Sequence, residues 1–169
     1  MKTLLVLRHA KSDWHADSGG DHDRPLNPRG RRAARAVGRF LSAAGVAPQQ
    51  VVSSSAVRAR HTAELAAEAG AWHARLEITR KLYDASPGTV IDAVQHADDD
   101  VEVLLVAGHE PTSSALVSTL IGGGRLRLPT AAAACVELSV SHWRELAPGR
   151  GHLRWLITPK LLRRIGWDG

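Results

Sequence analysis

The chain has 169 residues, of which 44% are hydrophobic, and it carries a formal net charge of +5 and a single cysteine. This size and apolar content suffice for one domain, which we expect to span residues 1–169. A single cysteine excludes an internal disulfide. No apolar run approaches the roughly 20 residues that cross a bilayer, and Met1 leads into a strand-like run without a signal-peptide pattern. We therefore expect a cytoplasmic protein with no membrane partner.

The basic charge raises the question of a nucleic-acid partner. The arginines are distributed along the chain, and only five Trp, one Tyr and one Phe are available to stack on bases. A group of arginines between residues 29 and 39 is more typical of the solvated face of a helix than of a docking site. We predict no nucleic-acid partner and interpret the charge as a basic enzyme surface or an adaptation to an anionic substrate.

A run of four aliphatic residues, 4–7, is followed at once by Arg8 and His9. Such a run suits a strand buried on both faces, as in the middle of a parallel sheet, and ligands of open α/β sheets bind at its carboxyl end. Arg8 offers a charged donor fork that matches phosphate oxygens, and His9 offers a nitrogen nucleophile or general base. Alone, such a pair is more often a surface arginine beside a hydrogen-bonded histidine, so other motifs must decide.

Residues 13–28 have the composition of a loop, and the length of this segment suggests that it covers the site. Asn27 is a suitable N-cap and Pro28 a suitable first residue for a helix that should end at Gly45. Further strands are predicted at 51–54, 76–79 and 101–107, and further helices at 56–69, 89–97 and 111–121. A hairpin of strands 131–140 and 152–157 and a short helix after residue 159 complete the chain.

An acidic triplet, residues 98–100, lies between the third predicted helix and the strand that follows it. Three adjacent carboxylates cannot all face one ion without a looped backbone, so a metal site is the less favoured interpretation. We predict a solvent-exposed turn.

Three polar motifs follow predicted strands: Arg8-His9, residues 53–58, and Gly108-His109. In a doubly wound sheet the strand ends lie at one edge, so the motifs are expected to converge. Two histidines and two arginines around one anion would supply a nucleophile, a charge clamp and a group that handles protons, which suffices for metal-free phosphoryl transfer. By itself His109 is equally well explained as a histidine bonded to a backbone carbonyl, and its pairing with His9 favours the catalytic interpretation.

Four segments carry a specific resemblance: Leu-Arg-His-Ala-Lys-Ser-Asp-Trp at 7–14, Arg-Pro-Leu-Asn-Pro-Arg-Gly at 24–30, Ser-Ser-Ala-Val-Arg-Ala-Arg-His-Thr-Ala at 54–63 and Gly-His-Glu-Pro at 108–111. Together they resemble the histidine phosphatase superfamily, which includes cofactor-dependent phosphoglycerate mutase. Their order and spacing match over roughly residues 3–125. The short chain, the continuation Ala-Lys-Ser after His9 and the absence of a cap insertion resemble the SixA-type phosphohistidine phosphatases. Ala10 replaces the glycine of the mutase branch, which removes no chemical group.

The resemblance implies a three-layer α/β/α sandwich with a mostly parallel central sheet, as in phosphoglycerate mutase, and no metal or cofactor. It makes His9 the nucleophile that takes the phosphoryl group, with Arg8, Arg58 and His109 holding its oxygens. Two guanidinium groups and one imidazolium balance the charge of a phosphoryl dianion. Arg58 is preferred to Arg60 because it occupies the motif position, and Arg60 would point elsewhere on the helix.

The general acid departs from the family pattern, because mutase-like members place a glutamate where this chain reads Leu-Tyr-Asp-Ala-Ser at 82–86. Asp84 is the candidate general acid, with capping of the next helix as its alternative role. A weaker acid would suit a phosphoramidate, since a histidine leaving group can carry its own proton. The resemblance also places Ser12 and His15 at the edge of the phosphate site, with Arg24 reaching in from the loop.

The predicted function is that of a cofactor-independent phosphatase with a phosphohistidine intermediate on His9, acting on phosphohistidine in proteins. A small-molecule phosphomonoesterase of the same superfamily is the alternative within this class. A noncatalytic phosphoprotein-binding module is the alternative from another class, and the intact His9 argues against it because binding alone needs no nucleophile. The expected partner is a phosphorylated substrate, and the chain is expected to be a monomer or a weak dimer.

Overall fold

The computed structural model describes residues 1–167. Within these residues six strands form one sheet: β1 (Lys2–Arg8), β2 (Gln50–Ser54), β3 (Arg75–Thr79), β4 (Val103–Gly108), β5 (Ala133–Leu138) and β6 (Gly151–Ile157). The helices are α1 (Pro28–Ala43), α2 (Val57–Ala69), α3 (Pro87–Val94), α4 (Thr112–Leu120) and α5 (Pro159–Arg164), with short 3-10 turns η1 (Arg80–Leu82) and η2 (Trp143–Glu145). None of these helices is long and apolar enough to cross a membrane.

The strand order of the sheet is β3-β2-β4-β1-β5-β6. β1 pairs in parallel with β4, and β2 pairs in parallel with both β4 and β3. β5 is antiparallel to β1 and to β6, which are therefore parallel to each other in direction, and β5 with β6 forms the predicted hairpin. The mostly parallel central sheet expected from the sequence is confirmed, with β3 at its edge.

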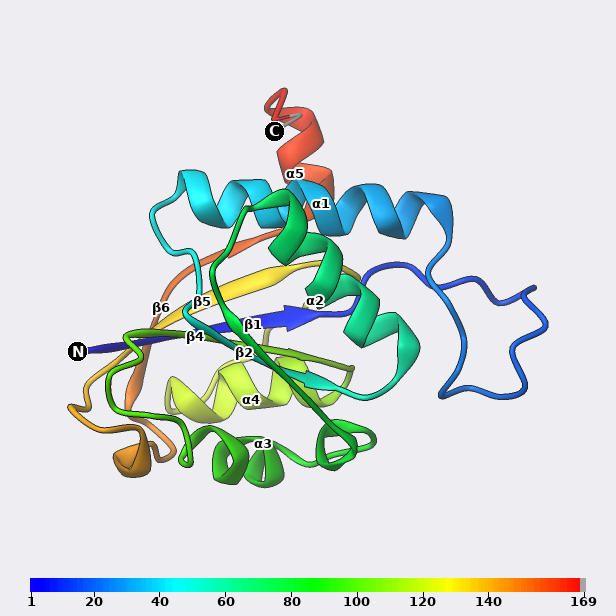
Figure 1. Cartoon of the computed structure of the whole chain (residues 1–169). Helices are drawn as coiled ribbons and strands as arrows, with labels where there is room; N and C mark the ends of the chain where they lie inside the picture. Colours follow the sequence, from blue (N-terminus) through cyan, green and yellow to red (C-terminus); the bar gives the residue numbers. More distant parts are fainter. Residues whose placement is uncertain (168–169) are drawn as a thin grey trace.

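Helices cover both faces of the sheet (Figure 1): α1, α2 and α5 lie on one side, and α3 and α4 on the other. The alternation of side chains along β1 supplies both interfaces, because successive residues of a strand point to opposite faces. Leu5 and Leu7 pack under α1 and α2, whereas Leu4 and Val6 pack against α3 and α4. All four are buried, which confirms a strand covered on both faces. The three-layer α/β/α arrangement follows from this pattern.

The first helix begins where the sequence predicts. The side chain of Asn27 accepts a hydrogen bond from the backbone N of Gly30 at 2.8 Å, and Pro28 is the first helical residue. Gly30 has no side chain where the helix meets the strand end, and a Cβ there would lie 2.1 Å from the backbone oxygen of Lys11. This close approach fixes the start of α1 against the segment that follows His9.

Several boundaries differ by one to three residues from the sequence prediction, and two of these differences have a clear physical cause. α3 begins at Pro87 rather than near Thr89, because the Ser86 hydroxyl caps the helix by accepting from the backbone N of Thr89 at 3.2 Å. β4 begins at Val103 rather than 101, because the backbone N of Val101 bonds to the oxygen of Asp98 and closes the acidic triplet into a turn. A serine N-cap followed by proline is a normal helix start, so the first boundary was readable in the sequence.

The single cysteine, Cys135, lies in the middle of β5 with its side chain fully buried. Burial raises the pKa of its thiol to about 11, because the thiolate would be desolvated.

The contact between α1 and α2 generates a stability prediction. A Cβ at Gly38 would lie 2.1 Å from the backbone oxygen of Ala66, and backbone atoms cannot rotate away. We expect Gly38→Ala to lower the free energy of unfolding by about 1–3 kcal/mol, measured by urea denaturation. The matched control is Gly88→Ala in α3, where the nearest atom to the new Cβ is 3.7 Å away. If both variants showed the same stability, the proposed close packing of α1 on α2 would be contradicted.

Candidate active site

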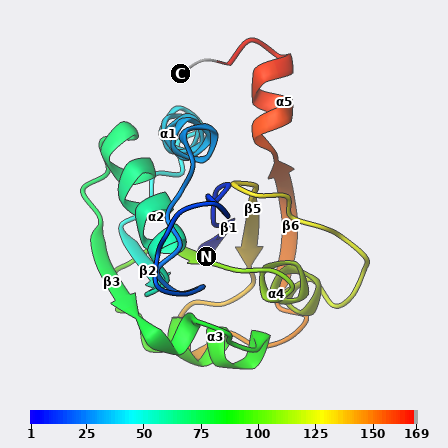
Figure 2. The same cartoon turned by 90° about the vertical axis from the view of Figure 1, so that its right-hand side faces the viewer.

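A cavity of about 390 Å³ opens at the carboxyl edge of β1 and β4, the edge that faces the viewer in Figure 2. It is bordered by the ends of these strands, the loop before α1, the start of α2 and the segment between η1 and α3. Six of the eight predicted site residues line it: Arg8, His9, Arg24, Arg58, Asp84 and His109. The three sequence motifs therefore converge as expected from the strand ends.

His9 is 8% exposed, and its Nδ1 lies 2.8 Å from the backbone oxygen of Ala10. A carbonyl oxygen can only accept, so Nδ1 carries the ring proton and Nε2 keeps a free lone pair. Burial lowers the pKa of His9 to about 3, and its electrostatic interactions with His109, Arg58 and Arg8 act in the same direction. The ring is therefore neutral near pH 7, as a nitrogen nucleophile must be.

The backbone next to His9 is held by the helix that carries Arg58. The backbone N of Ala10 donates to the Thr62 hydroxyl at 2.9 Å, and this hydroxyl donates to the backbone oxygen of Arg58 at 2.6 Å. Thr62 is fully buried, so the link is shielded from water. Two residues after Arg58, the Arg60 side chain points elsewhere: it pairs with a glutamate of its own helix and does not line the cavity.

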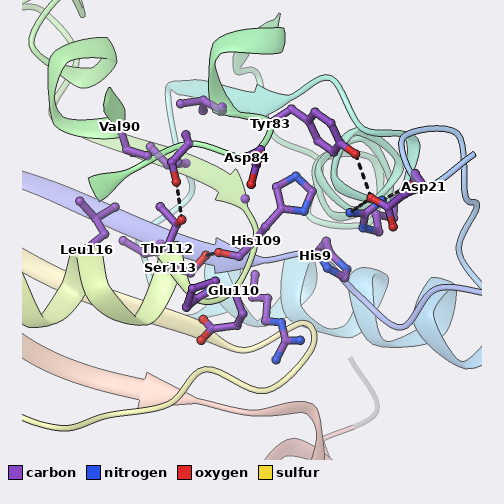
Figure 3. A pocket seen from close by; sticks show the side chains of 18 of the residues that line it. His9, Asp21, Tyr83, Asp84, Val90, His109, Glu110, Thr112, Ser113 and Leu116 are labelled. Carbon is purple, nitrogen blue, oxygen red and sulfur yellow. Dashed lines mark hydrogen bonds and ion pairs between the residues drawn. The ribbon is translucent and has the colours of Figure 1, made fainter. Parts of the chain in front are cut away.

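His109 faces His9, with a distance of 5.3 Å between ring centroids (Figure 3). Its Nε2 lies 2.8 Å from the Ser54 hydroxyl, whereas its Nδ1 is buried without a hydrogen-bond partner within residues 1–167. Burial lowers the pKa of His109 to about 4, with Arg58 contributing. With Ser54 donating to Nε2, the proton sits on Nδ1 and is available to a phosphoryl oxygen. A bound phosphoryl group would raise this pKa, so the expected imidazolium belongs to the occupied site.

Three arginines line the cavity, and each is partly held by the protein. Arg58 donates from Nη1 to the backbone oxygen of Asp21 at 2.6 Å and from Nη2 to its carboxylate at 2.9 Å. Arg24 donates to the same carboxylate at 2.7 Å, and Arg8 donates to the backbone oxygen of Leu128 at 2.8 Å. In the described chain, the Nε atoms of all three arginines are buried without a partner. Unpaired charged donors are costly to bury, and an anion would satisfy them.

Asp21 is a site residue that sequence reasoning missed. Its carboxylate accepts from Arg24, from Arg58 and from the Tyr83 hydroxyl at 2.9 Å (Figure 3). The hydrogen bond from Arg24 is the largest cause that holds the pKa of Asp21 well below its usual range. Asp21 thus places a negative charge of the protein itself next to Arg24 and Arg58. The available signal was an acidic residue three positions before Arg24, in the loop predicted to cover the site.

Three carboxylates line the cavity, and two of them are engaged. Asp21 is held by arginines, and the carboxylate of Glu110 accepts from the backbone N of Ser114 at 3.0 Å and from its hydroxyl. Asp84 is exposed, and its carboxylate makes no hydrogen bond within residues 1–167 (Figure 3). Ser86 rather than Asp84 caps the next helix. Asp84 is therefore the lining carboxylate that remains available for proton transfer.

Two predicted residues lie outside the cavity lining. Ser12 is buried and accepts a hydrogen bond from Arg24, so it orients that arginine. His15 is exposed on the loop, where its backbone N bonds to the carboxylate of Asp13 at 2.9 Å. The structure does not bring the His15 ring to the other site residues.

The family description of the histidine phosphatase superfamily (branch 1) matches residues 4–97, which is more than half of the chain. The protein belongs to this superfamily, as the four motifs predicted.

Relatives agree with this assignment. An uncharacterised protein of Mycobacterium tuberculosis is 41% identical over 165 residues, covering 91% of this chain and 100% of its own. A solved structure of the protein histidine phosphatase SixA with tungstate is similar, with a TM-score of 0.82, 25% identity, and coverage of 95% and 99% of the two chains. A protein from Nakamurella multipartitia provisionally named phosphohistidine phosphatase SixA has a TM-score of 0.82 and 29% identity over 94% and 96%. The resemblance to SixA-type proteins is confirmed at the level of fold and family.

The ion pairs of Asp21 with Arg24 and Arg58 generate a second prediction. Asp21→Asn keeps the shape of the side chain but removes the charge that competes for Arg24 and Arg58. We expect inorganic phosphate and tungstate to inhibit this variant about two- to fivefold more strongly, on the scale of a part-exposed ion pair. The inhibition constants are measured with p-nitrophenyl phosphate as substrate.

The control is Asp17→Asn, an exposed acid of the same loop outside the cavity lining. Weaker inhibition of Asp21→Asn would show that Asp21 positions the arginines for the anion and does not compete with it.

Proposed function

We propose that this protein is a metal-independent phosphatase that forms a phosphohistidine intermediate on His9 and acts on phosphohistidine in proteins. One observation carries the proposal: a neutral, oriented imidazole stands among four buried donors that lack partners within residues 1–167. These donors are the Nε atoms of Arg8, Arg24 and Arg58 and Nδ1 of His109. A phosphoryl group offers oxygens to such donors and a phosphorus atom to the nucleophile.

The reaction proceeds in two transfers. The lone pair of His9 Nε2 attacks phosphorus, the bond to the leaving group breaks, and Asp84 supplies a proton where the leaving group needs one. Arg8, Arg58 and His109 balance the negative charge on the phosphoryl oxygens in both transfers. Water then attacks the phosphohistidine, which releases inorganic phosphate and returns the electron pair to Nε2. The positive groups of the site supply the charge that a metal cation would otherwise bring.

The environment of Asp84, the candidate general acid, supports phosphohistidine as the substrate. Asp84 is exposed and no neighbouring group within residues 1–167 holds its carboxylate, in contrast to Asp21 and Glu110. A histidine leaving group can carry its own proton, so it depends less on a well-placed acid than an alkoxide does. Similarity to structures named as SixA phosphohistidine phosphatases points in the same direction.

The substrate class is tested with a panel of a phosphohistidine peptide, phosphoramidate and p-nitrophenyl phosphate, each with and without EDTA. We expect the highest kcat/KM for the phosphohistidine peptide and no effect of the chelator. A higher kcat/KM for the ester would favour the small-molecule phosphomonoesterase. Activity that EDTA abolishes and a divalent ion restores would refute the metal-independent mechanism.

The covalent step is tested at the nucleophile. His9→Ala removes the attacking nitrogen, so turnover should fall by at least about 10³-fold, as for other covalent nucleophiles. The quenched wild-type enzyme should carry a phosphate label that is stable in base and labile in acid, because a protonated imidazole leaves phosphorus readily. The His9→Ala protein should carry no such label. His15→Ala is the matched control, a histidine outside the cavity lining. Wild-type turnover by the His9→Ala protein would exclude His9 as the nucleophile.

The lowered histidine pKa values give a titration prediction. Burial favours the neutral rings of His9 and His109, whose pKa values are about 3 and about 4. In the free protein, neither ring should therefore gain a proton as the pH falls from 8 to 5, which NMR of the imidazole C–H signals can follow. Addition of phosphate should raise the pKa of His109. A midpoint near 6.5 for His9 in the free protein would contradict its buried, neutral state.

A further inference from the structure

A groove of about 500 Å³ lies between α1 and α5 on the face of the sheet that they share. α5 lies next to α1 and runs across its direction (Figures 1 and 2). We call this site the basic groove, and its principal residues are Arg29, Arg32, Arg35, Arg163, Ala33 and Leu162. The sequence favours a solvated face for the arginines of α1, whereas the structure places several of them around a hollow that apolar residues also line.

Within residues 1–167, the lining of the basic groove contains no acidic residue. Arg29, Arg32 and Arg163 are exposed and form no ion pair with Asp or Glu in the described chain. Arg35 reaches only Glu68 of α2, at 3.8 Å. The whole chain carries 17 acidic and 22 basic residues, which is close to balance. The excess of positive side chains in this lining is therefore a local property of this surface. Clustered like charges favour an oppositely charged partner.

The basic groove continues to the edge of the active site. A second hollow of about 380 Å³ shares Arg29 and Arg163 with the basic groove and adds Lys11 and Lys160. Lys11 is two residues from the nucleophile His9. Because β6 runs in the same direction as β1, α5 begins at the sheet edge where the catalytic cavity opens. A partner in the basic groove would therefore extend past the catalytic edge.

We propose that the basic groove docks an acidic amphipathic segment of the phosphorylated protein substrate. The proposal rests on the function proposed above, since it concerns a protein that presents phosphohistidine to His9. Carboxylates of the segment pair with Arg29, Arg32 and Arg163, and its apolar residues contact Ala33 and Leu162.

The lining distinguishes this partner from a nucleic acid. Binding of single-stranded nucleic acid depends on aromatic faces on which bases stack. Trp167 is the only aromatic residue of the basic groove lining within residues 1–167, and its ring packs edge-on against Phe40. The remaining contact surface is aliphatic, which suits apolar side chains of a protein segment.

Binding is tested with two fluorescent, unphosphorylated peptides of about 20 residues. One places Glu and Leu at helical spacing, and the other carries Gln in place of each Glu. At low salt, the wild-type protein should bind the Glu peptide at least about tenfold more tightly, and added salt should remove the difference. The double variant Arg32→Glu, Arg163→Glu should bind both peptides equally.

The matched control is Arg150→Glu, an exposed arginine in the β5–β6 turn at the opposite end of the sheet, which should keep the preference. Phosphohistidine versions of both peptides then report turnover, and p-nitrophenyl phosphate reports the catalytic cavity alone. The double variant should raise KM about tenfold for the acidic phosphohistidine peptide and leave the kinetics of p-nitrophenyl phosphate unchanged. Unfolding temperatures of all variants check that the fold is retained.

The outcomes separate the two proposals. Turnover of both phosphohistidine peptides without preference for the acidic one, or an unaffected double variant, would overturn the docking proposal alone. Absence of turnover with either phosphohistidine peptide, while p-nitrophenyl phosphate is hydrolysed, would overturn the proposed function and the docking role with it. Displacement of the Glu peptide by an RNA oligonucleotide at equal charge concentration would identify a general polyanion surface and also overturn the docking proposal.

Discussion

Positive charge is concentrated at one edge of the sheet, and the folded chain must hold it there when no phosphate is bound. Three guanidinium groups and two imidazoles surround the same cavity. Both imidazoles stay neutral because they are buried and lie close to arginines. Asp21 neutralises part of the remaining charge by pairing with Arg24 and Arg58. Within residues 1–167, the Nε atoms of the three arginines and Nδ1 of His109 stay buried without a partner, and these are donors that suit an anion.

The architecture makes this concentration possible. β1 is central in the sheet and covered on both faces, so its backbone position is fixed by packing on either side. His9 follows it directly, and the Thr62 hydroxyl ties the next residue to α2. Catalytic groups supported by packed strands and helices are held more accurately than groups on free loops. In this protein Arg8 and Arg58 come from such elements, and His9 and His109 directly follow β1 and β4, whereas Asp21 and Arg24 come from the loop.

The sequence predicted those parts of the molecule that depend on repeated or local patterns. Apolar runs predicted the buried strands, and the capping residues predicted the start of α1. The rule that the ends of parallel strands share an edge predicted that His9, Arg58 and His109 lie close together. The loop before α1 has no periodicity, so its conformation could not be derived from pattern. This is why Asp21 was missed and why His15, assigned by its motif position, lies outside the cavity lining. The hydrogen bond from the backbone N of Ala10 to the Thr62 hydroxyl is likewise a tertiary contact that no local rule specifies.

The buried state of Cys135 has a consequence for the redox behaviour of the protein. Its thiol is fully enclosed in β5, and its pKa of about 11 keeps it protonated at neutral pH. Peroxides and disulfides react with exposed thiolates, and this is the only cysteine in the sequence. The site itself is built from nitrogen donors and carboxylates. Oxidising conditions that inactivate enzymes with a cysteine nucleophile would therefore find no thiolate to modify in this one.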